Sequence, residues 1–330
     1  MPKNRVTLIG LGKRGLALAA ALRPTIDDIE IVGHDKEPEA ARRATEQKLV
    51  DKTEWNLLAA CEGARLIVIA IPQSGLEQTL RAIGPDADSG AIIVDLCPSK
   101  VASLQAARVV AEDVTYVSSD LIMSPARALP SGARPGPDAL NGAVWTLSRR
   151  AGSSTGGVDA LVGIISHMEA HPLMIEPAEH DGFRLALSAI PSALGYALVA
   201  AVSADNAWKD RQWLAGDAFG HATPGVAETA SAELARALLT DPMAAKHWLN
   251  QIMLELMALR DAVDAGDEIA LAARLKRAGE ARENWLADWR RGRNPERGAS
   301  NVKPPSILGA FMGESLAGKL RGPSKPPGKA

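Results

Sequence analysis

Cysteine is scarce in this chain of 330 residues, and the two cysteines present suggest neither a disulfide nor a metal site. Cys61 and Cys97 are far apart in the sequence, and no cluster of cysteines and histidines has the spacing of zinc ligands. We therefore expect a reducing cytoplasm as the location and no bound metal. The first residues fit this location, because the apolar stretch VTLIGLG is too short for a signal peptide and ends in glycines.

An excess of charge of either sign is also lacking, and so are long apolar segments. The formal net charge is −2, which gives the molecule no general affinity for nucleic acids or membrane surfaces. A membrane span needs roughly 20 consecutive apolar residues. The longest candidate, ALSAIPSALGYALVAAVSA, is interrupted by Pro191 and Gly195, so we expect a buried helix here. With nucleic acids and membranes excluded as partners, we expect the chain to act on a small-molecule substrate.

The length of the chain predicts two domains, and residues 1–174 read as the first, an α/β domain. Its strand-like segments are 5–10, 29–35, 64–72, 90–97, 114–119 and 142–148. The helix-like segments are 13–23, 37–48, 75–83, 99–111 and 156–168. Several strands are continuously apolar, as strands covered on both faces are. This alternation predicts a doubly wound parallel sheet.

Residues 175–290 read as an all-α domain, because no convincing strand remains and apolar residues recur at helical spacing. Asp241 and Pro242 form a helix start, with an N-cap followed by proline at the first helical position. The apolar stripes of these helices suit a core or a subunit interface better than a cofactor site. Residues 291–330 are basic and rich in glycine and proline, which predicts a mostly disordered tail.

The clearest motif is the turn GLGKRG, residues 10–15, between a predicted strand and a predicted helix. In this context Gly10 permits a tight turn, Gly12 lets a pyrophosphate approach the backbone, and Gly15 lets the helix pack against the strand. The free N–H groups of the helix N-terminus also attract anions. The turn therefore predicts a dinucleotide site.

Asp35 ends the second strand, 20 residues after Gly15, where a carboxylate accepts hydrogen bonds from an adenosine ribose. The same carboxylate would repel a 2′-phosphate, so NAD is favoured, while Lys36, Arg42 and Arg43 keep NADP possible. The residues predicted to hold the dinucleotide are Gly10, Leu11, Gly12, Lys13, Arg14, Gly15, Asp35, Lys36, Ala70, Ile71, Pro72 and Asp95.

Beyond these features, the order of motifs resembles the prephenate/arogenate dehydrogenase family over about residues 5–290. VDLCPSK (94–100) stands where that family has an Asp-x-Gly-Ser-x-Lys turn, and VSSDLIMSP (117–125) where it has a His-Pro-x-x-Gly turn. PAEHDGFRLALSAIPSAL (177–194) looks like its Glu-His-Asp helix. The resemblance implies a nicotinamide-binding Rossmann domain, a helical domain that forms a homodimer, and oxidative decarboxylation of a cyclohexadienol in tyrosine biosynthesis.

The departures from the family pattern fall on the residues that do the chemistry. Asp120 stands in the position of the catalytic histidine, and Cys97 and Pro98 replace the glycine and serine of the first turn. The family segment Gly-Phe-Arg-Asp-x-Thr-Arg has lost both arginines here. The residues expected to take part in catalysis are Asp120, Lys100 and Ser119, and those expected to bind substrate are His180 and His221.

Asp120 raises a question of charge, because prephenate carries two carboxylates. Like charges ~4 Å apart cost about 4 kcal/mol at an effective dielectric constant near 20. Either a cation balances the charge of Asp120, or the substrate differs, or no chemistry occurs. The candidate cations are Lys100, Arg127, Arg134, His180 and His221. Three hypotheses stay open: a dehydrogenase of this family with a changed site, an oxidoreductase for a less anionic substrate, and an inactive dinucleotide-binding homodimer. Asp120 could also be a loop residue without any chemistry.

Overall fold

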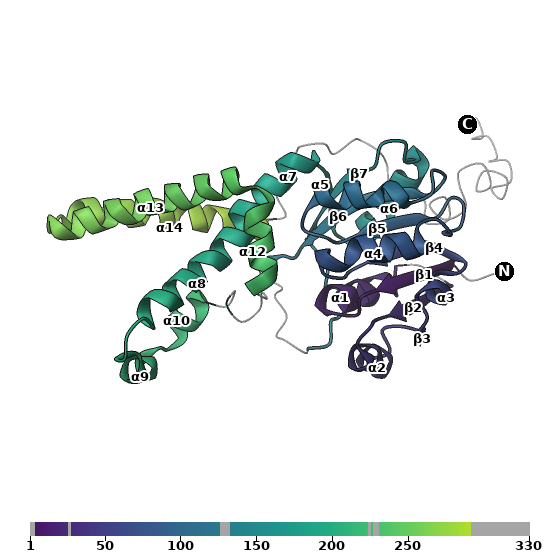
Figure 1. Ribbon diagram of the computed structural model, residues 1–330, viewed down its shortest axis with the longest axis horizontal. Coiled ribbons are helices and arrows are strands. Elements are labelled where there is room, and N and C mark those ends of the chain that lie inside the picture. Colours follow the sequence, from purple (N-terminus) through teal and green to yellow (C-terminus); the bar gives the residue numbers. More distant parts are fainter. Residues whose placement is uncertain (1–3, 26–27, 126–132, 224–225, 227–230, 292–330) are drawn as a thin grey trace, which may run out of the picture. The chain divides into compact units, whose positions relative to one another are not determined.

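The computed structural model describes residues 4–25, 28–125, 133–223, 226 and 231–291. They divide into two compact units (Figure 1). Of the described residues, the first contains those up to Pro177 together with Trp285–Arg291, and the second contains those within Ala178–Asn284. The predicted tail, apart from its first residue, lies outside the described residues.

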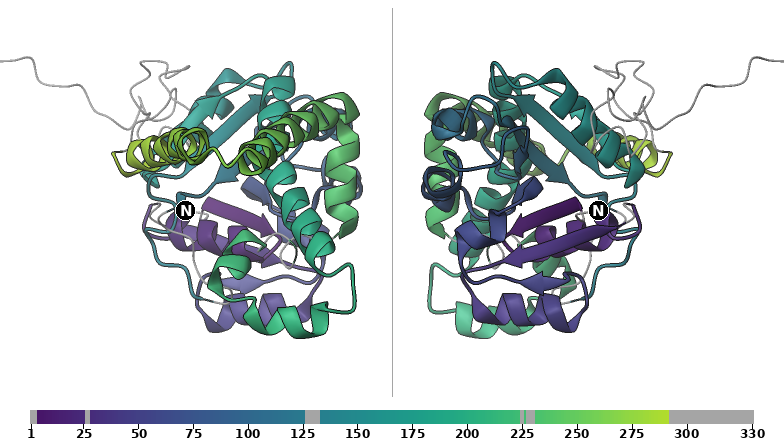
Figure 2. Two further views of the ribbon diagram at one scale, coloured as in Figure 1. Left: turned by 90° about the vertical axis from the view of Figure 1, so that its left-hand side faces the viewer. Right: turned by 90° about the vertical axis from the view of Figure 1, so that its right-hand side faces the viewer.

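The first unit is built on one eight-stranded sheet with the strand order β3-β2-β1-β4-β5-β6-β7-β8. Figure 2 shows the structure that contains this sheet from two opposite sides. The strands are β1 (Asn4–Ile9), β2 (Ile29–His34), β3 (Lys52–Thr53), β4 (Ala64–Ile69), β5 (Ile92–Asp95), β6 (Thr115–Ile122), β7 (Val144–Arg149) and β8 (His171–Met174). The order reverses between β1 and β4, which is where ligands bind in open sheets of this kind. The predicted α/β class is therefore confirmed.

Two strands depart from the predicted parallel sheet: β7 runs antiparallel to β6, and β8, which is parallel to β7, therefore also runs against the other six strands. A parallel neighbour needs a long crossover, usually a helix, and the described residues between β6 and β7 contain none. The pairing with β7 also lengthens β6, which the sequence analysis wrongly ended at Ser119. Asp120 therefore lies inside a strand, opposite Thr146, and the alternative interpretation as a loop residue is wrong.

Helices cover both faces of this sheet. They are α1 (Lys13–Leu22), α2 (Pro38–Glu46), α3 (Leu57–Cys61), α4 (Gln73–Ile83), α5 (Lys100–Ala106) and α6 (Thr155–His167). Alternate residues of the central strands enter two separate cores. Leu66 and Val68 of β4 pack in one core with α1 and α6, whereas Ile67 and Ile69 pack in the other with α4. Burial on both faces explains why these strands are continuously apolar.

The described residues of the second unit form helices and connecting turns and no strand, as predicted. Its elements are α7 (Pro177–Arg184), a π-helical turn (Leu185–Ala189), α8 (Ile190–Val202), α9 (Trp208–Arg211), a 3₁₀ turn (Gln212–Leu214), α10 (Asp217–Ala222), α12 (Ser231–Thr240), α13 (Pro242–Asp264) and α14 (Glu268–Arg290). The helix start predicted at Asp241 is present, because its carboxylate accepts a hydrogen bond of 2.9 Å from Ala244 N.

The apolar segment around α8 is far less buried than the sequence led us to expect. The continuous helix Pro177–Val202 has the length and composition of a membrane span, which is weak evidence by itself. Only 17% of its most apolar window is buried within the chain. The expectation of a buried helix is wrong for the single chain. The second unit has only a small core, which covers part of the apolar surface of this helix. Leu187 lies on the uncovered part, with 77% of its surface exposed.

Candidate functional site

The glycine turn between β1 and α1 has the close packing that its sequence requires. Gly10 has a φ angle of +98°, and a Cβ atom there would lie 2.5 Å from the carbonyl oxygen of Ala70. A Cβ atom on Gly15 would lie 2.0 Å from the carbonyl oxygen of Gly10. Gly12 differs from both, because a Cβ atom there would meet nothing within 4 Å. Two glycines thus let β1, β4 and α1 approach each other, and the third leaves the backbone open at the N-terminus of α1.

Asp35 joins the end of β2 to this turn. One of its carboxylate oxygens accepts a hydrogen bond of 2.7 Å from Leu11 N, and the other accepts one of 2.9 Å from Glu37 N. The carboxylate is thereby fixed beside the open face of the turn, where an adenosine ribose binds in folds of this type. The nearby Arg42 forms ion pairs with Glu39 and Glu46 on its own helix. The side chain of Lys36 is 86% exposed.

Asp95, at the carboxyl end of β5, is the centre of a buried hydrogen-bond network. Its Oδ2 accepts hydrogen bonds from the hydroxyls of Ser103 (2.6 Å) and Tyr116 (2.7 Å), and its Oδ1 accepts one from Cys97 N (2.9 Å). Burial raises the pKa of Asp95, while Lys100 and these hydrogen bonds oppose the rise. Burial also raises the pKa of the Cys97 thiol and of the Tyr116 hydroxyl, so both stay neutral. Asp95 therefore shapes the turn after β5.

This raised pKa predicts a pH dependence of stability. The folded protein keeps the proton of Asp95 to a higher pH than the unfolded chain does, in which the carboxyl has a pKa near 3.9. The contribution to stability is thus fully present below the unfolded pKa and is lost as the pH rises through the folded pKa. Each unit of the rise corresponds to about 1.4 kcal/mol.

We expect urea unfolding at about pH 3.5 and pH 8 to show a larger loss of stability for the wild type than for Asp95→Asn, because this range begins below the unfolded pKa. Other titrating groups cancel in this comparison, because both proteins contain them. An equal loss in the two proteins would mean that Asp95 titrates alike in the folded and unfolded states.

Two of the predicted catalytic side chains are buried and make contacts within the first unit. The Ser119 hydroxyl donates to the carbonyl oxygen of Asp95 at 2.5 Å and accepts a hydrogen bond of 2.8 Å from Trp145 Nε1. The Lys100 ammonium donates a hydrogen bond of 2.8 Å to the carbonyl oxygen of Cys97. Both groups thus stabilise the carboxyl ends of β5 and β6, and their catalytic roles stay predictions.

Asp120 has a cationic partner, Arg14, that is not among the five candidates named from the sequence. Nη1 of Arg14, in the glycine turn, lies 3.3 Å from Oδ1 of Asp120 and donates a hydrogen bond of 3.1 Å to the carbonyl oxygen of Leu96. The Asp120 side chain is 0% exposed, whereas that of Arg14 is 38% exposed. Of the cations that were named, Arg134 is exposed and Arg127 lies outside the described residues. The contact joins the predicted dinucleotide turn directly to the predicted base.

The family model of the prephenate dehydrogenase nucleotide-binding domain matches residues 18–172, which contain Asp35, Asp95 and Asp120. This part of the chain matches the prephenate dehydrogenase family. The resemblance noted in the sequence is thereby confirmed, and the fold agrees with it. No curated protein sequence matches the chain.

Solved structures of this family share the fold over most of the chain. Prephenate dehydrogenase from Aquifex aeolicus, in complex with hydroxyphenyl propionate and NAD⁺, has a TM-score of 0.74 at 16% identity and covers 86% of this chain and 99% of its own. Synechocystis arogenate dehydrogenase has a TM-score of 0.65 at 18% identity, with 85% and 99% covered. A putative prephenate dehydrogenase from Corynebacterium glutamicum has a TM-score of 0.67 at 17% identity, with 88% and 95% covered. Identities this low show a common fold only.

The two histidines predicted to bind substrate belong to the second unit. His180 of α7 is buried, and its Nδ1 lies 3.1 Å from a carboxylate oxygen of Asp181. His221 is exposed in the last turn of α10. A histidine held by the adjacent aspartate also suits a structural role at this end of the helix. Substrate binding by either residue therefore stays a prediction.

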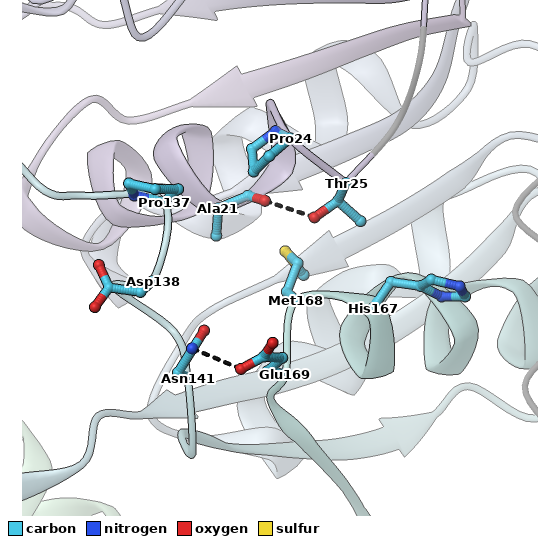
Figure 3. A pocket seen from close by; sticks show the side chains of 9 residues that line it. All are labelled: Ala21, Pro24, Thr25, Pro137, Asp138, Asn141, His167, Met168 and Glu169. Carbon is cyan, nitrogen blue, oxygen red and sulfur yellow. Dashed lines mark hydrogen bonds between the residues drawn. The ribbon is translucent and has the colours of Figure 1, made fainter.

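Two hollows lie in the first unit. One, of about 430 Å³, lies between the ends of α1 and α6 and the segment 137–141 (Figure 3). Asp138 and Glu169 line it, and no lysine or arginine does, so it would repel a diphosphate. The other, of about 340 Å³, is formed by residues 148–149 and 174–177. Neither contains a residue of the glycine turn or Asp120.

Proposed function

We propose that the chain is an NAD-dependent oxidoreductase that converts a cyclohexadienol by loss of hydride and carbon dioxide, as in tyrosine biosynthesis. In this proposal Asp120 accepts the hydroxyl proton in place of a histidine. The observation that carries it is the 3.3 Å contact between Arg14 and Asp120, which puts a carboxylate beside the turn that would seat the dinucleotide. A positioned carboxylate is a competent general base.

The residues of the turn fit a nicotinamide dinucleotide. The open backbone at Gly12 and the N-terminus of α1, a helix of 10 residues, suit a diphosphate, and the carboxylate of Asp35 suits a ribose. When bound, the dinucleotide accepts the hydride. Asp35 would repel a 2′-phosphate, and Arg42 is already paired with two carboxylates, so NAD is favoured over NADP. The prephenate dehydrogenase from Aquifex aeolicus was solved with NAD⁺, which supports the same choice.

The charge balance favours a substrate with less negative charge than prephenate. Arg14 and Asp120 together carry no net charge, so the pair supplies no surplus cation for a substrate dianion. Arogenate has an ammonium group where prephenate has a keto group, and it therefore carries one net negative charge less. We infer a cyclohexadienol of this kind as the substrate of a cytoplasmic homodimer, in which the exposed apolar side chains of α8 and α13 would form the subunit interface.

A second candidate function is a dinucleotide-binding homodimer without activity. The observation that favours it is the internal use of Ser119 and Lys100, whose polar atoms contact backbone and Trp145 within the first unit. In such a site the residues that bind the cofactor are kept, but the groups expected to be catalytic have structural roles. The protein would then bind the dinucleotide and transfer no hydride.

The experiment that separates the two candidates combines binding and turnover on the full chain. Calorimetry with NAD⁺ and NADP⁺ gives the dinucleotide affinity, and the appearance of reduced dinucleotide with prephenate or arogenate gives the activity. We expect tighter binding of NAD⁺ and turnover with arogenate at a lower KM than with prephenate. Micromolar binding of NAD⁺ without turnover of either substrate would contradict the enzyme and support the second candidate.

A further inference from the structure

We propose that Arg14 is a positioning residue for Asp120, which it holds as a charged carboxylate at one place and in one orientation. The inference rests on the proposed role of Asp120 as the proton acceptor. It assigns to the side chain of Arg14 a role that differs from the dinucleotide binding expected from the sequence. The backbone of Arg14 stays part of the dinucleotide turn.

The position of Arg14 explains how its side chain reaches the base. Arg14 is the second residue of α1, two residues after Gly12. Its guanidinium spans the carboxyl ends of two neighbouring strands, because Leu96 directly follows β5 and Asp120 lies in β6. Two partners on two strands define where the guanidinium sits.

The difference in burial shows which partner depends on the other. The Asp120 side chain is 0% exposed, and a buried carboxylate without a cation nearby is strongly disfavoured. The Arg14 side chain is 38% exposed and keeps part of its contact with water. Removal of the Asp120 carboxylate should therefore lower the stability of the folded protein only slightly, because Arg14 keeps its contact with water. Removal of the Arg14 guanidinium should lower it more, because it leaves a buried charge without this counter-ion. Among the described residues, the only hydrogen bond of the Arg14 side chain goes to the carbonyl oxygen of Leu96, which leaves its charge to pair with Asp120.

The predicted dinucleotide-binding turn and Arg14, which pairs with Asp120, thus belong to one short segment of backbone. The turn around Gly12 would bind the diphosphate through its N–H groups. The side chain that leaves the same turn at Arg14 fixes Asp120. Removal of the Arg14 side chain should therefore lower kcat through Asp120 and leave the dinucleotide affinity almost unchanged.

A double-mutant cycle tests the coupling without any need for activity. The proteins are the full-length wild type, Arg14→Met, Asp120→Asn and the double variant, and the measurement is the thermal unfolding midpoint without ligand. We expect Arg14→Met to lower the midpoint by about 5 °C or more when Asp120 is present, and by less than half of that in the Asp120→Asn background. Equal losses in the two backgrounds would overturn the inference.

Kinetics and dinucleotide binding give the second measurement. We expect Arg14→Met to lower kcat about 100-fold or more and to change the dinucleotide Kd by less than about threefold. Arg14→Lys, which keeps a cation, should recover at least about tenfold of the lost kcat. A rise of about tenfold or more in the dinucleotide Kd, with the same rise in the Asp120→Asn background, would show instead that the guanidinium binds the diphosphate.

Arg23→Met is the matched control, because Arg23 follows the same helix, has the same side-chain exposure of 38% and forms its own ion pair of 3.0 Å with Asp51. It should leave kcat within about twofold. The measurements also separate the two proposals. Coupled unfolding midpoints without turnover would contradict the proposed function and support the Arg14–Asp120 contact. Turnover with additive midpoints would contradict this inference alone.

Discussion

Asp120→Asn is expected to lower kcat by about a thousandfold with the preferred cyclohexadienol, while the dinucleotide Kd changes by less than about threefold. Asparagine has almost the size and shape of aspartate, but its amide cannot accept the substrate proton. General base catalysis contributes about 10²–10⁴-fold to a rate, which sets the expected loss. The measurement is the steady-state formation of reduced dinucleotide at saturating concentrations of both ligands.

The control for this prediction is Asp113→Asn, which makes the same chemical change at an exposed residue just before β6. It should keep the activity of the wild type. Asp120→Asn should also keep the fold, because the partner that loses its carboxylate, Arg14, is partly exposed to water. A folded Asp120→Asn protein with more than about a tenth of the wild-type kcat would show that Asp120 is not the proton acceptor.

The position of Asp120 also shows where sequence reasoning was sufficient and where it was not. The order of motifs placed Asp120 at the family's histidine position, and the prephenate dehydrogenase family model matches the part of the chain that contains Asp120. The residue was assigned to a loop because VTYVSS reads as a complete strand. Its place inside β6 depends on the antiparallel pairing with β7, a contact between segments far apart in the chain.

The antiparallel direction of β7 was within reach of the sequence. No helix was predicted between the strands at 114–119 and 142–148, and a parallel neighbour without a crossover helix is rare. β8 was harder to find, since its four residues, HPLM, are too few to show a periodic pattern. Two residues form β3, which gave no signal of its own.

Arg14 was missed as the partner of Asp120 for a physical reason. The glycine motif fixes the course of the backbone and assigns a role to each glycine, but it does not state where the side chains between the glycines point. Only the three-dimensional arrangement shows that the second residue of α1 reaches past β4 to the ends of β5 and β6. Lys100 was a better candidate by sequence, yet its ammonium contacts the carbonyl of Cys97. Long side chains at strand ends cannot be assigned to partners from spacing alone.

Gly15→Ala and Gly12→Ala should separate the fold of the turn from its ability to bind a dinucleotide. A methyl group on residue 15 would lie 2.0 Å from the carbonyl oxygen of Gly10, and backbone must move to admit it. We expect Gly15→Ala to lower the thermal midpoint by about 5 °C or more and to abolish measurable binding of NAD⁺. A methyl group on residue 12 meets no protein atom within 4 Å, so Gly12→Ala should unfold within about 2 °C of the wild type.

Gly12→Ala should nevertheless raise the Kd for NAD⁺ about tenfold or more, because the methyl group occupies the space through which the diphosphate approaches the backbone. Gly279→Ala in α14 is the control, since its methyl group also meets nothing within 4 Å and lies far along the sequence from the turn. It should leave the Kd unchanged. Calorimetry with NAD⁺ on the three variants checks the prediction. Wild-type affinity in Gly12→Ala would mean that the dinucleotide does not bind against this face of the turn.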